Sequence, residues 1–211
     1  MSSVVIRPFE DRDFEAVAGM FHETWGWELE GPESVKLDLA AYYVAGIVAK
    51  STTLLVADVG GTAVGCAFLT EKTPREDRIN RAAYMTVLKM KAHALSLDAH
   101  GRGMLAFYDK LEEVFDALVD RMQEHGKNWE VELNLLLTSC SCRGQGVGRR
   151  LVQAVAEHMC RHRQSWCMLR TDTHCDWRYY EKTGWQRAAE VCWQDDSNIT
   201  AYAYRKALAQ P

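Results

Sequence analysis

The stretch "RGQGVGRRL", Arg143–Leu151, places three glycines on alternate positions directly before an apolar pattern with helical spacing. Glycine lowers helix stability, so a glycine cluster at a helix start usually marks main chain that another group approaches closely. Without Cβ atoms, successive backbone N–H groups at the positive end of a helix can close on a phosphate, and arginines flank this stretch on both sides. The stretch therefore predicts an anion-binding turn at the start of a helix.

Two well-known phosphate-binding patterns do not describe these glycines. A dinucleotide fingerprint reads Gly-x-Gly-x-x-Gly, whereas Gly144, Gly146 and Gly148 read Gly-x-Gly-x-Gly. A nucleotide P-loop requires Gly-Lys followed by Ser or Thr, and the stretch has no such Lys and Ser. The pattern that remains is Arg143-x-x-Gly146-x-Gly148 between a strand and a helix.

The segments around this turn alternate between strand and helix patterns. "WEVELNLLLTS", residues 129–139, has strand character, and the apolar spacing from Leu151 to Met159 is helical. Two β-rich runs joined across Gly60 and Gly61 predict a hairpin. The other expected elements are a strand at 4–8, helices at 11–25 and 35–47, a strand at 165–172, a short helix at 176–184, and strands at 185–194 and 198–208.

The pattern changes between about residues 76 and 126. Two long helical patterns, residues 77–98 and 104–125, meet at "AHGRG", where Gly101 and Gly103 are expected to supply the break. Strand character resumes directly afterwards, which predicts a helical hairpin inserted between strands. The resulting order, β-α-α-β-β-(αα)-β-α-β-α-β-β, predicts a single α/β domain with a mixed sheet and this insertion.

Composition limits the classes of protein that fit. A chain of 211 residues with 47% hydrophobic residues can bury a core as one domain. A net charge of −4 leaves no basic stripe for nucleic acid. No apolar run reaches the roughly 18 residues of a membrane span, and the first residues do not resemble a secretion signal. We therefore expect a soluble cytoplasmic protein that binds neither nucleic acid nor membranes.

The seven cysteines are an odd number with irregular spacing, which predicts free thiols, most of them buried. Cys140, Cys142, His158 and His162 are candidate zinc ligands because the two histidines lie one helical turn apart. Cys-x-Cys differs from the usual zinc knuckle, so no metal is expected.

The glycine turn and its flanks also resemble a known family. Arg143-x-x-Gly146-x-Gly148 resembles the acetyl-CoA-binding motif of the GNAT superfamily of N-acetyltransferases: Arg or Gln, two residues, Gly, one residue, then Gly or Ala. "WRYYEKTGW", Trp177–Trp185, resembles a later segment in which a tyrosine precedes Glu-Lys-x-Gly-Phe, with Trp185 replacing the common Phe. "IRPFEDRDFEAVAGMF" and the Gly-Gly hairpin are similar as well. Departures are Thr138 and Cys140, where many members carry Val and Pro.

This resemblance implies a GNAT-like fold: a mixed, mostly antiparallel central sheet flanked by helices. It also implies acetyl-CoA as co-substrate, with the pyrophosphate on the glycine turn and the pantetheine on strand backbone groups. Backbone N–H groups near Leu136 and Leu137, where the family splays its strand with a bulge, would hold the thioester carbonyl. The coenzyme-binding residues expected on this basis are Leu136, Leu137, Thr138, Arg143, Gly144, Gln145, Gly146, Val147, Gly148, Arg149 and Tyr180.

Acetyl transfer to an amine needs a base for the amine and a proton for the departing thiolate. Alternation along 129–139 places Glu130, Glu132 and Asn134 on one face. Family members often carry a base about eleven residues before the Arg or Gln, which falls on Glu132, so Glu132 is the expected base or water-holder and Glu130 the second choice. Both could instead be solvated strand-edge carboxylates. Tyr180 matches the family's tyrosine and is the expected acid, the alternative being a core tyrosine.

Acceptor selection is expected from "TWGWELEGPE" and the insertion. Trp25, Trp27 and Glu28 form part of an aromatic and acidic cluster suited to a cationic amine. Asp172 is a further candidate because it lies at the C-terminal end of a strand. An exposed acidic loop above packed tryptophans explains the same residues without a ligand.

The sequence thus predicts an acetyl-CoA-dependent N-acetyltransferase that uses direct transfer in a ternary complex. Two alternatives stay open: a non-catalytic acyl-CoA-binding module, and a structural protein that assembles through the helical hairpin. The sequence does not fix the acyl group or the acceptor amine, which is a small molecule or a peptide. It also leaves the oligomeric state open, including a homodimer.

Overall fold

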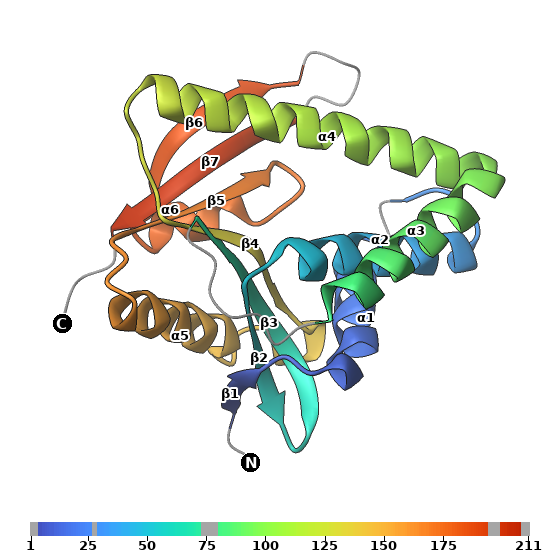
Figure 1. Cartoon of the computed structure of the whole chain (residues 1–211), viewed down its shortest axis with the longest axis horizontal. Helices are drawn as coiled ribbons and strands as arrows, with labels where there is room; N and C mark the ends of the chain where they lie inside the picture. The colour runs from blue at the N-terminus through green and yellow to red at the C-terminus, as the bar shows by residue number, and fades with distance from the viewer. Residues whose placement is uncertain (1–3, 27–28, 73–79, 194–198, 208–211) are drawn as a thin grey trace. The chain divides into compact units, whose positions relative to one another are not determined.

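The computed structural model describes residues 4–26, 29–72, 80–193 and 199–207 (Figure 1). Helices and strands follow one another in the order expected from the sequence. They are β1 (Val5–Pro8), η1 (Asp11–Asp13), α1 (Phe14–Trp25), α2 (Glu33–Lys50), β2 (Thr53–Val59), β3 (Thr62–Glu71), α3 (Arg81–Leu97), α4 (Ala99–Glu124), β4 (Val131–Thr138), η3 (Cys140–Cys142), α5 (Val147–Arg161), β5 (Trp166–Asp172), α6 (Trp177–Lys182), β6 (Gln186–Cys192) and β7 (Thr200–Ala207). The segment that joins the last two expected strands, residues 195–198, lies outside the described residues.

Seven strands form one sheet in the order β1-β2-β3-β4-β5-β7-β6. The pairs β1–β2, β2–β3, β5–β7 and β6–β7 are antiparallel. Strands β4 and β5 pair in parallel, with the register Val131↔Cys167 and Glu132↔Met168. The sheet is therefore mixed and mostly antiparallel, as expected, because the β4–β5 connection contains a helix instead of a tight turn.

The chain divides into two compact units. Unit 1 comprises Met1–Ala106 and Asn134–Glu157, and unit 2 comprises Phe107–Leu133 and His158–Pro211. The first part of α4, the second half of β4 and most of α5 thus belong to unit 1. A single domain with a helical insertion stays a prediction.

Helices α1 and α2 contribute apolar residues to the core of unit 1. Helix α1 buries Val17 and Phe21, which lie one turn apart, and α2 buries Leu39 and Val48. The strands of the β2–β3 hairpin turn at Gly60 and Gly61, which have φ of 63° and 89°. Those positive φ values explain why glycine occupies both positions.

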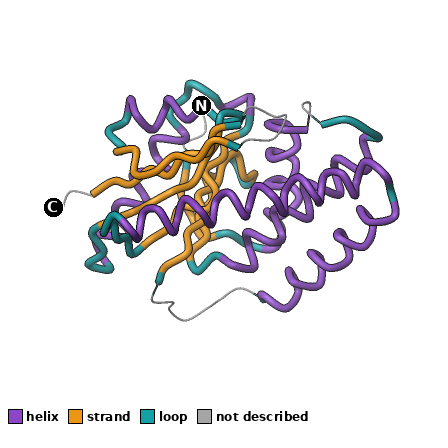
Figure 2. The backbone as a smooth tube through the Cα atoms, turned by 90° about the horizontal axis from the view of Figure 1, so that it is seen from above, coloured by secondary structure: helices purple, strands orange, loops and turns teal. Residues whose placement is uncertain are grey.

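The break between α3 and α4 corrects the sequence interpretation. It lies at Asp98, where the backbone is extended (φ −105°, ψ 146°), while Gly101 and Gly103 are helical. Asp98 Oδ1 accepts hydrogen bonds from the N–H groups of His100 at 2.8 Å and Gly101 at 3.2 Å, so Asp98 caps α4. Figure 2 shows how short the non-helical segment is. Gly101 is required for another reason: a Cβ there would collide with the main chain of Leu95.

Unit 2 packs α4 on the strands that follow it in sequence. The apolar stripe of α4 includes Leu111, Phe115, Leu118 and Met122, spaced three or four residues apart. The same buried cluster contains Trp129, Met168, Ala188, Ala201 and Ala203. Small residues on β6 and β7 leave room for the large side chains of the helix.

All seven cysteines are free, as expected. The expectation that most of them are buried is wrong: Cys66 and Cys167 are buried, whereas Cys140 and Cys192 are exposed and the other three are intermediate. Burial raises the pKa of the Cys167 thiol to about 12, so this residue stays a neutral core thiol. No helix among the described residues is long and apolar enough to cross a membrane.

Candidate functional site

The predicted anion-binding turn lies in unit 1, between β4 and α5. Gly144 and Gly146 have φ of 75° and 79°, a conformation that residues with a Cβ rarely adopt, and α5 begins at Val147. Gly148 is helical, and a Cβ there would be 3.9 Å from Thr138 Cγ2. Gly144 and Gly146 are therefore needed for the shape of the turn, whereas a Cβ at Gly148 would make only an ordinary van der Waals contact.

The first turn of α5 presents unused hydrogen-bond donors. The first helical bond of this turn runs from the Arg150 N–H to the Gly146 carbonyl at 3.1 Å. Within the part of the chain that the structure describes, the N–H groups of Val147, Gly148 and Arg149 have no acceptor. A helix N-terminus carries about half a positive charge. The turn can therefore accept a phosphate group without breaking an existing hydrogen bond.

Strand β3 fixes the position of this helix start. A Cβ at Gly65 would lie 2.9 Å from Leu137 O, 3.1 Å from Leu151 Cδ1 and 3.2 Å from Val147 Cγ1. Glycine at position 65 therefore allows the start of α5 and strand β4 to pack closely against β3. A glycine inside an apolar strand pattern is the sequence signal that could have identified this close approach.

The last turn of α1 holds the segment before the glycines. The Glu23 carboxylate accepts hydrogen bonds from the Cys140 N–H at 3.3 Å and the Ser139 hydroxyl at 3.4 Å. Arg143 donates to Thr24 Oγ1 at 3.2 Å, and its guanidinium is exposed. Glu23 thus anchors the turn. No local sequence signal pointed to Thr24.

The main-chain groups of β4 alternate in direction. The Ser139 N–H donates to Val64 O at 2.9 Å, and Leu137 O faces Gly65, so these odd-numbered residues direct their polar groups toward β3. Leu136 and Thr138 consequently direct theirs away from β3. Of the three strand residues expected to bind the coenzyme, Leu136 and Thr138 therefore have main-chain groups suited to an extended ligand, whereas the Leu137 carbonyl faces the sheet.

The two candidate bases lie in unit 2 and differ in their contacts. Glu130 accepts hydrogen bonds from the N–H groups of Trp166 at 2.7 Å and Ser165 at 3.3 Å, which fixes the start of β5. Glu132 Oε1 accepts a hydrogen bond from Arg170 Nε at 2.8 Å, and the Glu132 side chain is 19% exposed. These contacts favour a structural role for Glu130 and leave Glu132 Oε2 for chemistry.

Tyr180 lies on α6 in unit 2 and is half-buried among aromatic rings. Its ring centroid is 5.9 Å from that of Trp185 and 5.8 Å from that of Tyr204. Burial raises the pKa of its hydroxyl well above the ordinary value of 10, so the phenol keeps its proton near neutral pH. No other residue of the described chain hydrogen-bonds this hydroxyl, which is therefore free to donate.

The C-terminal end of α6 explains the "EKTGW" pattern. Gly184 has φ of 83°, and the Trp185 N–H donates to the Tyr180 carbonyl at 3.0 Å while the Gly184 N–H donates to the Glu181 carbonyl at 3.2 Å. This is a Schellman-type helix end, which requires a left-handed residue. It holds the backbone at Tyr180 in a fixed position.

Two of the four expected acceptor residues lie among the described residues, Trp25 in unit 1 and Asp172 in unit 2. Trp25 packs on Phe21 with ring centroids 4.7 Å apart. Asp172 is buried, and its Oδ1 accepts the His174 N–H at 2.7 Å, which closes the turn after β5. Trp27 and Glu28 lie outside the described residues. Trp25 and Asp172 therefore have structural roles that explain their positions without an acceptor.

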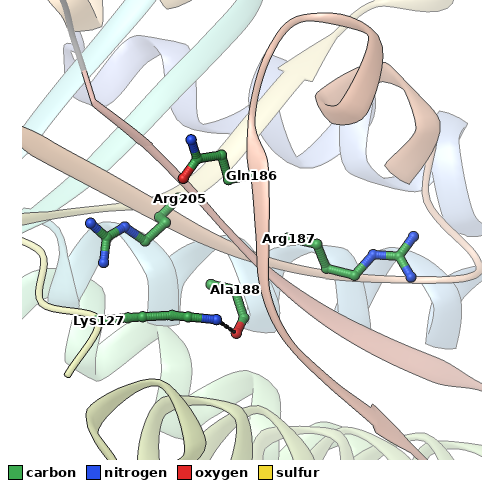
Figure 3. Close-up of a pocket in the computed structure, with 5 residues that line it drawn as sticks. All are labelled: Lys127, Gln186, Arg187, Ala188 and Arg205. Atoms are coloured by element: carbon green, nitrogen blue, oxygen red, sulfur yellow. Dashed lines mark hydrogen bonds between the residues drawn. The ribbon is translucent and has the colours of Figure 1, made fainter. Parts of the chain in front are cut away.

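Unit 2 also has a shallow pocket lined by Lys127, Gln186, Arg187, Ala188 and Arg205, none of them an expected site residue (Figure 3). Its cations already have contacts. Lys127 Nζ donates to the Ala188 carbonyl, Arg187 contacts Glu181 and Glu190, and Arg205 lies 3.5 Å above the Trp166 ring centroid. These contacts explain the basic residues of the pocket as part of the packing around β6 and β7.

Comparison with known proteins agrees with the glycine turn and the sheet. The sequence pattern of the acetyltransferase (GNAT) family matches residues 16–185. The chain therefore belongs to the GNAT family of acetyltransferases, which use acetyl-CoA. A search of curated proteins gives no match.

Several solved structures share the fold at low sequence identity. One is an aminoglycoside 6'-N-acetyltransferase complexed with coenzyme A, with 13% identity, a TM-score of 0.57 and 98% of each chain covered. Another is a mosquito arylalkylamine N-acetyltransferase-like protein, with 14% identity, a TM-score of 0.56, and 98% of this chain and 100% of that chain covered. A Corynebacterium glutamicum protein described as histone acetyltransferase HPA2 and related acetyltransferase has 17% identity and a TM-score of 0.56, with 100% of this chain and 99% of that chain covered.

Proposed function

We propose that this protein is an acetyl-CoA-dependent N-acetyltransferase that moves an acetyl group to a primary amine by direct transfer in a ternary complex. The observation that carries the proposal is the turn before α5. Two positive-φ glycines there lead into three consecutive N–H groups that have no acceptor in the described chain. A pyrophosphate supplies the charge and the acceptor oxygens that such a turn lacks.

The residues of unit 1 fit the coenzyme. In this proposal, the main chain from Gly144 to Arg149 holds the phosphates, and Arg143 and Arg149 add positive charge from exposed positions. The outward-directed main-chain groups of Leu136 and Thr138 bind the pantetheine. Bound acetyl-CoA supplies the activated acetyl group.

The residues of unit 2 supply the proton transfers. An alkylamine has a pKa near ~10 and is mostly protonated at neutral pH, so a base must remove a proton before the nitrogen can attack. Glu132, directly or through water, accepts that proton. The amine nitrogen then bonds to the acetyl carbon, the carbon–sulfur bond breaks, and the Tyr180 hydroxyl donates a proton to the leaving sulfur. The nitrogen loses its second proton, directly or through water, to the Tyr180 oxygen, which leaves a neutral amide and restores the phenol.

Calorimetric titration with acetyl-CoA tests the proposal, and the chain offers a matched pair of variants. Gly146 and Gly126 both have positive φ, 79° and 64°, and both lack close contacts for an added Cβ. Gly146→Glu adds bulk and negative charge at the turn, whereas Gly126→Glu adds them after α4. We expect wild-type protein and Gly126→Glu to bind and Gly146→Glu to lose binding.

The outcomes separate the functions considered. Binding without turnover on any primary amine would favour the non-catalytic acyl-CoA-binding module. If the folded wild-type protein does not bind acetyl-CoA, the enzymatic proposal is wrong, and an assembly role for the protein becomes the better interpretation.

A further inference from the structure

Arg170 of β5 connects the candidate base to the inserted helix α4, and all the residues involved belong to unit 2. Glu132 pairs with Met168 in the parallel register, and Arg170 lies two residues further along β5. Because alternate strand residues share a face, Glu132 and Arg170 lie on the same side of the sheet. Their side chains meet there through the 2.8 Å contact between Arg170 Nε and Glu132 Oε1.

The other end of the guanidinium faces α4. Arg170 Nη1 is 3.4 Å from Glu112 Oε2 and 3.7 Å from Asp116 Oδ1, two carboxylates one helical turn apart. Between them, the ring of Phe115 lies 5.2 Å from Arg170 Cζ. The Arg170 side chain is only 11% exposed, so these contacts hold it in one place.

We propose that Arg170 is a positioning residue for Glu132, and that Glu112 and Asp116 on α4 set how strongly Arg170 pairs with it. This inference rests on the proposed role of Glu132 as base. The Nε–Oε1 hydrogen bond fixes the carboxylate and leaves Oε2 to accept the proton. An arginine paired with Glu132 alone would stabilise the ionised carboxylate fully and weaken it as a base. Three carboxylates share this single guanidinium, so its interaction with Glu132 is weaker than in an isolated pair.

The contacts of Arg170 with α4 also give the inserted helix a role in the proposed chemistry. Glu112, Asp116 and Glu132 are three carboxylates around this one guanidinium. A protonated amine is attracted to carboxylates before it loses its proton. Helix α4 therefore contributes to the chemistry of the base through Glu112 and Asp116, in addition to burying its apolar stripe.

The first test needs neither coenzyme nor acceptor. Carboxyl carbons of labelled glutamates are followed by NMR across an acid titration, with Glu132 assigned from the signal missing in Glu132→Gln. Charged groups that contact Arg170 besides Glu132 include Glu112 and Asp116 from α4, and the charge of Glu132 also acts on the Cys167 thiol of β5. We expect Arg170→Gln to move the Glu132 titration midpoint to higher pH because the neighbouring cation is lost.

Two further variants make the expected direction specific. Glu112→Gln combined with Asp116→Asn should move the midpoint to lower pH, because two carboxylates that compete with Glu132 for Arg170 are then neutral. Arg121→Gln is the control on the same helix, since the Arg121 guanidinium donates to the Glu190 carbonyl. An unchanged midpoint in folded Arg170→Gln would overturn the inference.

The second test is a double-mutant cycle on acetylation of spermidine or 2-phenylethylamine, whichever is turned over. We expect Arg170→Gln to lower kcat by about 10- to 100-fold through misplacement of the base, with unchanged acetyl-CoA affinity. In a Glu132→Gln background it should have no further effect on kcat, because a positioning residue acts through its target. Additive losses would contradict the positioning role. A fully active Glu132→Gln would instead remove Glu132 from the proposed mechanism, while loss of acetyl-CoA binding by the wild type would refute the proposed function itself.

Discussion

A Cβ atom at Gly65 would lie 2.9 Å from the carbonyl oxygen of Leu137, so the main chains of β3 and β4 approach here more closely than any side chain allows. The neighbouring contacts are with Leu151 and Val147 of α5. This approach sets where the first turn of α5 begins, and therefore where its unused N–H groups point.

Gly65→Val should destabilise the protein by about 1–3 kcal/mol, because the backbone of β4 has to move away from the added atoms. It should also weaken acetyl-CoA binding through displacement of the α5 start. Urea unfolding and calorimetry measure the two effects. Gly19→Ala is the control: position 19 is helical, has no atom within 4 Å of an added Cβ, and should leave binding unchanged.

Two glycines in α4 should respond in opposite ways to the same change. Gly103→Ala should stabilise the protein by about 0.5–1 kcal/mol, because alanine favours a helix and nothing lies within 4 Å of the new atom. Gly101→Ala should destabilise it, because the new atom meets the Leu95 main chain. Equal effects in urea unfolding would contradict the packing between the end of α3 and the start of α4.

Tyr180→Phe should separate binding from chemistry. The phenol keeps its proton at neutral pH because burial raises its pKa. Loss of that donor should lower kcat about 100-fold, while acetyl-CoA affinity, measured by calorimetry, stays within about twofold because the turn before α5 is unchanged. Tyr179→Phe provides a control on the same helix. Unchanged turnover in Tyr180→Phe would remove this residue from the mechanism.

Arg7 should determine stability in acid. It donates to Asp13 at 2.7 and 2.8 Å and to Asp58 at 2.8 and 3.0 Å. Burial alone would raise the pKa of Asp13, but hydrogen bonds from Arg7 and the Glu10 N–H outweigh this effect and lower that pKa. The hydrogen bond from Arg7 also lowers the pKa of Asp58. A lowered pKa in the folded state means that the unfolded state binds protons first. The resulting stability is present above about pH 4 and is lost as the pH falls through the lowered values.

Arg7→Gln should therefore cost about 1–3 kcal/mol at neutral pH, since the buried Asp13 carboxylate loses its partner, and the stability should fall less steeply in acid. Urea unfolding at several pH values measures both effects. Arg12→Gln breaks an exposed pair with Glu10, in which the side chains are 63% and 54% exposed, and should cost less than about 1 kcal/mol. A cost for Arg7→Gln no larger than this control would contradict the argument.

Local sequence patterns were sufficient for the element order and for the shape of the glycine turn. Period-2 alternation predicted β4, and positive φ explains Gly144 and Gly146. Both are properties of short segments, so neighbouring residues determine them. The break between α3 and α4 was misplaced because two glycines look like a helix end, whereas Asp98 supplies the cap and Gly101 serves a close contact.

The sequence by itself determined the family, the order of strands and helices, and the segment suited to bind a phosphate. The tertiary structure decided which side chains act together. Arg170 meets Glu132 across 38 positions of sequence, and Cys140 meets Glu23 across 117. Such pairings depend on strand register and helix packing, which bring distant residues within hydrogen-bonding distance, and no local pattern encodes the distance between two such atoms.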